Sequence, residues 1–357
     1  MNKLDLDYQA LLNDILIYGH IKKTRNGHTR SVFGRTIRHN MADGFPLLTT
    51  KKLHFRGIVA ELLWFLRGST DIRELWKDKC HIWDGDWYKR YSSSCSSPYS
   101  LAEMKALCGD TQFDSSIWDL GPIYGAQFRR WGAHEDDYGN GHYTQIDQIE
   151  NLVNELITNP DSRRLMVNAW NVGELSQMTL PPCHYGFQVY TRLLTKSEKF
   201  KIYEKSKLNI SIDGNSLQLD HMDTKFYPTS LPQRAISLIW NQRSCDTALG
   251  IPYNLASYGL LLEIFGKITN MVPEELIGNL GDVHIYENQI DGIQEQLTRT
   301  PFELPKVVID EEPFGDYLWG NHESPVPIGN LFLNLTTDGF RVDNYQSHPS
   351  IKMPLSN

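Results

Sequence analysis

The chain has 357 residues, of which 40% are hydrophobic and 22% are charged, and its formal net charge is −8. This length allows one large domain or two ordinary ones, and the composition is that of a globular protein with a sizeable core. The acidic balance argues against broad nucleic-acid binding, which needs a basic face. A few buried arginines can still hold a small phosphate.

Targeting and redox signals point to a cytoplasmic protein. No apolar run approaches the length of a membrane helix, and the segment after Met1 lacks the apolar stretch of a secretion signal. The cysteine count is odd, and no two cysteines form a Cys-x-x-Cys pair. We therefore expect no disulfide framework, no metal site and no membrane association.

In the first third of the chain, apolar spacing predicts two helices, one from Leu4 to Ile15 and one over residues 55–66. The second helix is apolar on almost every side, so it is predicted to be buried. It contains Glu61, and a carboxylate there needs either a salt-bridge partner or a chemical role. Residues 91–98 are predicted to be a loop, and Ser100 is predicted to cap a short helix ending near Leu107.

The rest of the chain mixes helices and strands. Helices are predicted over residues 145–159, 255–269 and about 288–297, and strands over 165–170, 184–191 and 236–242. Residues 193–235 are polar and are predicted to be irregular, apart from a strand-like piece at 208–212. Leu331, Leu333 and Leu335 alternate as in a half-buried strand. Without a regular strand–helix alternation, this order predicts an α+β fold.

Cys183 is the first candidate for chemistry, because Pro181 and Pro182 constrain the backbone before it and a predicted strand follows. A thiol at such a rigid edge is well placed to act as a nucleophile. Considered alone, a single cysteine is more often a small buried hydrophobic residue.

Two basic segments are candidates for binding phosphate. Arg243 and Ser244 lie at the end of a predicted strand, and Arg163 and Arg164 are adjacent in a predicted turn. A guanidinium fork and a hydroxyl suit a phosphate, although each group alone is more often part of a surface salt bridge.

Asn254 lies where a loop is predicted to become a helix, so an N-cap is its simplest role. Its amide also donates and accepts at once, which matches the O4 and N3–H edge of uracil. His284 and Tyr286 share one face of a predicted strand at period two. They are either ligands of a ribose hydroxyl or ordinary core residues.

These segments belong to a longer series of motifs that resembles the thymidylate synthase family. In chain order the motifs are Asp43–Lys52, Glu61–Phe65, Ile82–Asp84, Leu120–Gly125, Leu180–His184, Asn241–Asp246, Leu249–Tyr258, Gly281–Tyr286 and His348–Pro354. The resemblance runs from about residue 4 to residue 357. Two stretches, about 88–118 and 193–235, interrupt it and are interpreted as insertions.

The resemblance implies a single α+β domain over residues 1–357, with a mixed sheet that forms the interface of a homodimer. It implies transfer of a one-carbon unit from 5,10-methylenetetrahydrofolate to C5 of dUMP, through a covalent adduct on Cys183. The products would be dTMP and dihydrofolate. Cys183 would attack C6 of the uracil, and covalent attack divides one difficult step into easier ones. No metal, membrane or nucleic-acid partner is implied.

The resemblance also implies residue roles. The catalytic residues would be Cys183, Glu61, Tyr124, Asn254 and Arg243. The nucleotide would be held by Arg25, Arg163, Arg164, Gln242, Ser244, Asp246, Asn254, His284 and Tyr286, with Arg163 and Arg164 donated by the partner subunit. The folate would be held by Lys51, Ile82, Trp83, Trp87, Asp246, Leu249, Gly250, Tyr253 and Leu355. Asn254 favours dUMP, because an aspartate is expected there in relatives that use cytosine.

The sequence departs from the family pattern at several places. The loop around Arg25 is shortened by one residue, and Trp87 follows Trp83 at a spacing one residue longer than usual. Tyr253 replaces a usual phenylalanine beside the folate, and Asn241 stands where tyrosine is common. The last three residues, 355–357, are more polar than the usual apolar end.

Three alternatives remain at this point. A dUMP hydroxymethylase would use the same catalytic residues and add water instead of hydride, and the polar tail and Tyr253 are features that would admit water. A family member that only binds, as a structural or RNA-binding protein, is disfavoured because Cys183, Asn254, Arg243 and Tyr124 are all present. A simple thiol hydrolase is disfavoured because no separate His–Asp dyad is evident.

Overall fold

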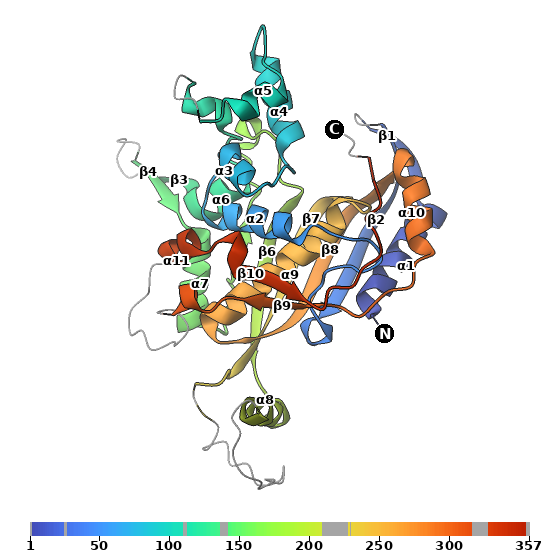
Figure 1. The fold of residues 1–357 in the computed structure, drawn as a ribbon. Helices are drawn as coiled ribbons and strands as arrows, with labels where there is room; N and C mark the ends of the chain where they lie inside the picture. Colours follow the sequence, from blue (N-terminus) through green and yellow to red (C-terminus); the bar gives the residue numbers. More distant parts are fainter. Residues whose placement is uncertain are drawn as a thin grey trace.

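A computed structural model describes residues 2–24, 27–109, 113–135, 142–208, 228, 230–315 and 328–354. Its centre is a six-stranded mixed sheet in the order β1-β2-β8-β7-β6-β5 (Figure 1). The strands are β1 (His20–Thr24), β2 (Gly27–Asn40), β5 (Met166–Asn168), β6 (His184–Leu193), β7 (Arg234–Asp246) and β8 (Val272–Tyr286). The pair β7–β8 is parallel, and the other pairs of this sheet are antiparallel. The α+β prediction is therefore confirmed.

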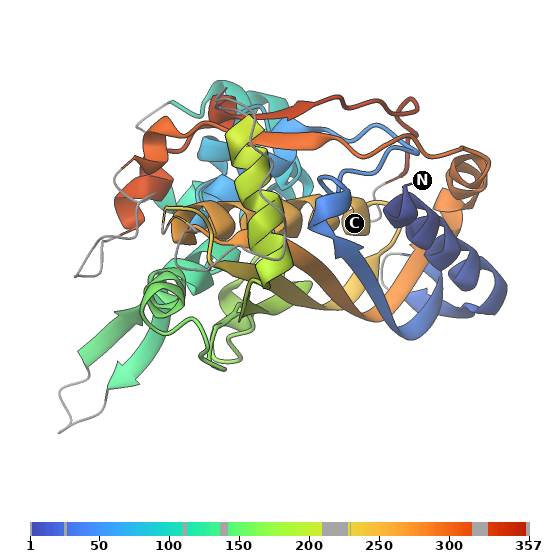
Figure 2. The same ribbon diagram turned by 90° about the horizontal axis from the view of Figure 1, so that it is seen from below.

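The parallel pair is joined by a long crossover helix, α9 (Gly250–Thr269), which packs on both strands. A parallel connection needs such a crossover, and it brings the carboxyl ends of β7 and β8 to the same edge of the sheet. Helices α1 (Lys3–Tyr18) and α2 (Phe55–Leu66) complete the layer, α1 against β2 and α2 against α9 (Figure 2). The buried core lies between this helical layer and the sheet.

The remaining elements surround this core. The helices are α3 (Ile72–Lys77), α4 (Asp84–Ser94), α5 (Leu101–Ala106), α6 (Tyr124–Arg130), α7 (Gln148–Thr158), α8 (Lys196–Leu208), α10 (Ile290–Leu297) and α11 (Gly329–Asn334). Two small antiparallel pairs are formed by β3 (Trp131–Glu135) with β4 (His142–Ile146), and by β9 (Lys306–Ile309) with β10 (Phe340–Asp343). None of the helices in the described segments is both long and apolar enough to cross a membrane.

The two insertions lie at opposite ends of the molecule, with α4 and α5 at the top of Figure 1 and α8 at the bottom. The first insertion packs against the residues before it in an aromatic core formed by Trp76, Trp87, Tyr91 and Trp118. Trp87 stacks between Tyr91, at a centroid distance of 5.4 Å, and Trp118, at 5.7 Å, and Trp76 meets Trp87 edge-on at 5.3 Å. The predicted cap at Ser100 is confirmed, because Ser100 and Glu103 form a capping box. The predicted loop at 91–98 is partly wrong, because α4 continues to Ser94.

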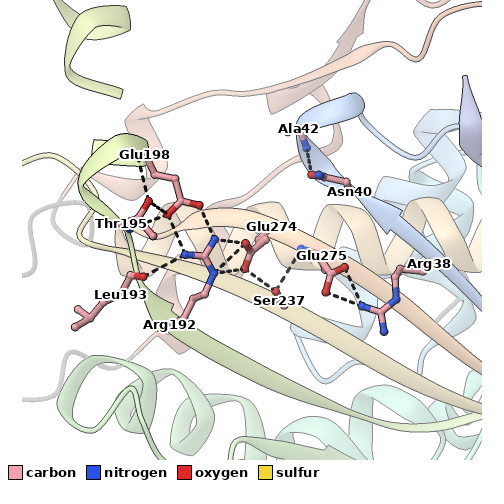
Figure 3. A network of polar contacts seen from close by, with 10 residues as sticks. All are labelled: Arg38, Asn40, Ala42, Arg192, Leu193, Thr195, Glu198, Ser237, Glu274 and Glu275. Carbon is pink, nitrogen blue, oxygen red and sulfur yellow. Dashed lines mark hydrogen bonds and ion pairs between the residues drawn. The ribbon is translucent and has the colours of Figure 1, made fainter. Parts of the chain in front are cut away.

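The second insertion was predicted to be irregular, and that prediction is wrong where the structure describes it. Helix α8 occupies residues 196–208 and begins with a capping box in which Thr195 and Glu198 exchange hydrogen bonds. Arg192 of β6 ties this helix to the sheet by contacting Glu198 and Glu274 of β8 (Figure 3). The helix lacks an apolar stripe, so periodicity could not reveal it. Of the strand predicted at 208–212, Leu208 is the last residue of α8, and residues 209–212 lie outside the described segments.

Three other predictions need correction. The predicted strand at Leu331–Leu335 is helix α11, because Leu331 and Leu335 are buried at helical spacing while Leu333 is 63% exposed. The predicted helix at 145–159 begins only at Gln148, after strand β4. Helix α9 begins at Gly250 and not at residue 255, since Pro252 is tolerated in the first turn of a helix.

We expect Asp5 to contribute strongly to stability. Its carboxylate is fully buried and accepts hydrogen bonds from the backbone amides and hydroxyls of Thr49 and Thr50. Asp5→Ala leaves these buried donors unpaired, so the free energy of unfolding should fall by about 2–4 kcal/mol in urea titrations. The matched control is Asp7→Ala on the same helix, which breaks only the exposed Lys3–Asp7 pair and should cost less than about 1 kcal/mol. Equal losses in the two variants would contradict this account.

Candidate active site

The backbone on both sides of Cys183 is held by hydrogen bonds. The Cys183 amide donates to the Tyr124 hydroxyl oxygen at 2.8 Å, and the Cys183 carbonyl accepts from the Arg243 amide at 2.9 Å. The five cysteines, all in described segments, form no disulfide, and Cys183 is half-buried. The thiol is therefore carried by a fixed backbone, as expected for a nucleophile.

Tyr124 begins α6 and is 3% exposed. Burial raises the pKa of Tyr124 well above its ordinary value, and the nearby Cys183 and Glu61 raise it further. Tyr124 is thus a neutral hydroxyl at physiological pH. Because its oxygen accepts the Cys183 amide proton, its own proton remains to be donated to another group.

Two residues that sequence reasoning did not assign, His184 and Tyr258, lie beside Tyr124. His184 stacks on Tyr124 at a centroid distance of 4.3 Å, and its Nδ1 lies 2.8 Å from the Tyr258 hydroxyl. Burial lowers the pKa of His184 to about 3, so its imidazole is neutral. Its position directly after Cys183 was a signal available in the sequence, whereas Tyr258 becomes a neighbour only through the packing of α9 on β6.

Glu61 of α2 faces the same region. Its Oε1 accepts a hydrogen bond from Trp83 Nε1 at 2.8 Å, and burial raises the pKa of Glu61 to about 7. A carboxyl with this pKa can take up or release a proton near neutral pH, as proton transfer in catalysis requires. Phe65, one turn later on α2, packs on Tyr124 at 4.8 Å and joins the two helices.

The end of β7 carries groups that hold neighbouring segments in place. Arg243 donates from Nε to the Pro182 carbonyl at 2.9 Å and from Nη2 to the Pro181 carbonyl at 3.0 Å, and its guanidinium lies over Trp170. The side chain is nevertheless exposed. Arg243 therefore braces the loop before Cys183 while still facing solvent, next to the half-buried Ser244.

Asn254 is oriented by its neighbour in β7. Gln242, which is 3% exposed, donates from Nε2 to Asn254 Oδ1 at 3.2 Å. The helix N-cap is Leu249, so Asn254 lies in the second turn of α9 and the predicted N-cap role is wrong. Because an N-cap does not occupy this amide, it remains suited to reading a ligand with both a donor and an acceptor.

The end of β8 lies beside the end of β7, with Asp246 in register with His284. The His284 and Tyr286 rings are 5.4 Å apart on the shared strand face that the sequence predicted. Fully buried Gln289, which sequence reasoning missed, donates to the Asp246 carboxylate at 3.3 Å and to the Pro354 carbonyl at 3.2 Å. Gln289 also accepts from the Tyr286 amide, so one side chain links both strand ends to the C-terminal segment.

The predicted folate residues differ in their exposure to solvent. Ile82 is 46% exposed next to Trp83, and Tyr253 is half-buried on α9, which begins after Leu249 with Gly250. Lys51 is 3% exposed and donates to the Ala248 carbonyl, and burial lowers its pKa to about 8. Trp87 is 1% exposed: its ring stacks with those of Tyr91 and Trp118, and its Nε1 donates to the Ile117 carbonyl.

Arg163 and Arg164 are exposed and lie apart from the other candidates. They precede β5, and Leu165 accepts a hydrogen bond from the Val189 amide. At about 3.3 Å per strand residue, the run of β6 from Val189 back to Cys183 spans roughly 20 Å. Within one chain, these two arginines are therefore remote from Cys183. Arg25 and Leu355, also predicted site residues, lie outside the described residues.

Within the described segments, no three His, Cys, Asp or Glu side chains are grouped so that they could hold a metal ion. The chain matches a family model described as thymidylate synthase over residues 6–357. The match covers essentially the whole chain.

The raised pKa of Glu61 predicts a dependence of stability on pH. The folded state binds the Glu61 proton more tightly than the unfolded state between about pH 4.5 and 7, so the wild type loses stability as pH rises through this window. Glu61→Gln keeps an acceptor for Trp83 without the buried charge. At pH 8 it should be more stable than wild type by about 1–3 kcal/mol, and near pH 4.5 the difference should vanish.

Urea unfolding at the two pH values measures this difference. Glu303→Gln is the control, because Glu303 is exposed. The free energy of unfolding of this variant should differ from that of wild type by the same amount at both pH values. A Glu61→Gln variant less stable than wild type at pH 8 would show that the ionised carboxylate is stabilised in the folded protein.

Proposed function

Because this chain belongs to the thymidylate synthase family, whose members carry out folate-dependent one-carbon transfer onto dUMP, we propose that it converts dUMP and 5,10-methylenetetrahydrofolate into dTMP and dihydrofolate. The observation that carries the proposal is the Cys183–Tyr124 hydrogen bond. It holds a half-buried thiol beside a neutral hydroxyl and near a carboxyl whose pKa is about 7.

In this proposal the chain first binds and orients the nucleotide. Asn254, fixed by Gln242, holds the O4 and N3–H edge of uracil, and His284 and Tyr286 hold the ribose. Arg243 and Ser244, together with Arg25 and the partner's Arg163 and Arg164, hold the phosphate. These contacts present C6 of the base to Cys183.

The Cys183 sulfur then bonds to C6, and the C5=C6 electrons move toward C5 and O4, where the Asn254 amide stabilises the developing charge. Glu61 and Tyr124 carry protons to and from the base, including removal of the C5 proton after the new carbon bond forms. Elimination of the thiolate from C6 frees Cys183. The reduced folate supplies the one-carbon unit and, in a synthase, the hydride that completes the methyl group.

The described residues fit a reduced folate. Ile82 offers an exposed apolar surface next to Trp83, and Asp246 offers a carboxylate oriented by Gln289 and by the amides of residues 248 and 249. The rest of the folate site would be formed by Leu249, Gly250, Tyr253, Leu355 and Lys51. Lys51 would first have to leave the Ala248 carbonyl to meet a folate carboxylate.

The first experiment is to incubate the protein with dUMP and 5,10-methylenetetrahydrofolate, follow dihydrofolate absorbance and weigh the nucleotide product by mass spectrometry. We expect dTMP and dihydrofolate. Hydroxymethyl-dUMP without dihydrofolate would instead identify the dUMP hydroxymethylase. Cys183→Ala should abolish turnover while dUMP still binds, and Cys245→Ala, a buried thiol on β7, is the matched control that should keep turnover. No product from either dUMP or dCMP would overturn the proposal.

We also propose that the active form is a cytoplasmic homodimer of a single catalytic domain. Arg163 and Arg164 are too far from Cys183 to serve their own site. The sheet face turned away from α9 offers a surface for pairing, with Tyr190 64% exposed and the neighbouring Ile239 and Ile277 half-buried. A second copy that packed on this face would bring its arginines to the partner's nucleotide.

Subunit complementation tests this arrangement. Cys183→Ala and the double variant Arg163→Ala/Arg164→Ala should each be nearly inactive alone. Mixed after mild dissociation, they form hybrid dimers in which one of the two sites has both the thiol and the arginines, so roughly a quarter of the wild-type activity should return. Activity that does not rise above the sum of the separate variants would contradict donation across the interface.

A further inference from the structure

Arg90 of α4, a residue of the first insertion, contacts the two loops that lead to Tyr124 and to Cys183. Its Nη1 contacts the Leu120 carbonyl at 3.2 Å, the Gln177 carbonyl at 2.9 Å and the Thr179 hydroxyl at 3.0 Å. Leu120 precedes Tyr124 by four residues, and Thr179 precedes Cys183 by four residues. Arg90 therefore joins the two loops on the approach to the candidate catalytic pair.

The two loops run side by side between Arg90 and the catalytic pair. The Thr179 amide donates to the Leu120 carbonyl at 3.0 Å, and four residues later the Cys183 amide donates to the Tyr124 hydroxyl at 2.8 Å. The approach is close: at Gly121, where φ is +80°, an added Cβ would lie 2.3 Å from the Gln177 carbonyl oxygen. With so little space between the backbones, a shift at Arg90 would be transmitted toward Cys183.

Arg90 is itself held in place by the insertion. It lies on α4 between Trp87 and Tyr91, which stack on each other, and Trp118 stacks on the other face of Trp87. Trp118 is two residues before Leu120, so the insertion returns to the loop that Arg90 contacts. At the start of α4, Lys105 of α5 contacts Asp84, the residue after the Glu61 partner Trp83. The aromatic core thus fixes the helix that presents Arg90.

We propose that Arg90 is a positioning residue for the reaction: by bridging residues 120 and 177–179, it sets the distance between the Tyr124 and Cys183 loops. Through Arg90, the insertion at 88–118 then supports the loop that precedes Cys183. This inference rests on the proposed function for its kinetic effect, but its structural effect on the two loops can be measured without any substrate.

Arg90→Met removes the guanidinium group and keeps most of the aliphatic part of the side chain. We expect kcat for dUMP to fall by about 10-fold to 100-fold, because small misplacements of reacting groups have effects of this size, while the Kd for dUMP is unchanged. Arg90→Lys should recover part of the loss, since an ammonium also offers several donors from a shorter chain. Hydrogen–deuterium exchange of the protein without substrate should accelerate in peptides covering residues 120–124 and 177–184.

Arg35→Met is the matched control. Arg35 also contacts two backbone carbonyls, those of Phe33 and Gly34, and it pairs with Asp14 between α1 and β2. It should leave kcat and exchange in both peptides unchanged. The proposal is overturned if Arg90→Met exchanges like wild type in both peptides, or if kcat, Kd and melting temperature change equally in the two variants. Failure of the wild type to turn over dUMP would refute the proposed function, and the exchange result would still decide the role of Arg90.

Discussion

The parallel pairing of β7 with β8 is the constraint on which the rest of the site depends. A parallel pair cannot be closed by a tight turn, so the chain must cross over through α9. The crossover brings three groups to one sheet edge: the end of β7 with Arg243 and Asp246, the end of β8 with His284 and Tyr286, and the second turn of α9 with Asn254. Residues far apart in sequence become neighbours because of this topology.

Burial sets the chemistry of the groups at this edge. It raises the pKa of Glu61 to about 7, keeps the Tyr124 hydroxyl protonated and keeps the His184 imidazole neutral. The same burial disfavours the ionised form of Glu61 in the folded protein. Stability and reactivity are therefore opposed at this residue, which is common where a carboxyl must exchange a proton near neutral pH.

The insertions extend this architecture in different ways. The first insertion builds an aromatic core around Trp87 and turns Arg90 toward the loops beside Cys183. Trp87, which directly precedes the insertion, is held in this core by the stacked rings of Tyr91 and Trp118. The second insertion begins with α8, which Arg192 ties to Glu274 of the sheet (Figure 3). Arg192 lies at the end of β6 that is remote from Cys183. The first insertion thus contacts the loops beside Cys183, whereas the second contacts the opposite end of the sheet.

The sequence by itself determined the elements with a strong apolar period, such as α1, α2 and most of β6 and β7, and it identified the family through motifs in a fixed order. It also identified the types of residue that the chemistry needs, since a thiol after two prolines and an amide beside a strand end are local features. It failed at α8 and α11, where a charged helix has no apolar stripe and a short apolar run suits either period.

Only the tertiary structure decided which of these groups meet. The Gln242–Asn254 contact, the stacking of His184 on Tyr124 and the three contacts of Arg90 join residues from separate elements. The shift in the pKa of Glu61 likewise arises from the protein packed around it. Periodicity and composition describe neighbours along the chain, whereas contacts and burial depend on how distant segments pack, so these properties followed from the fold alone.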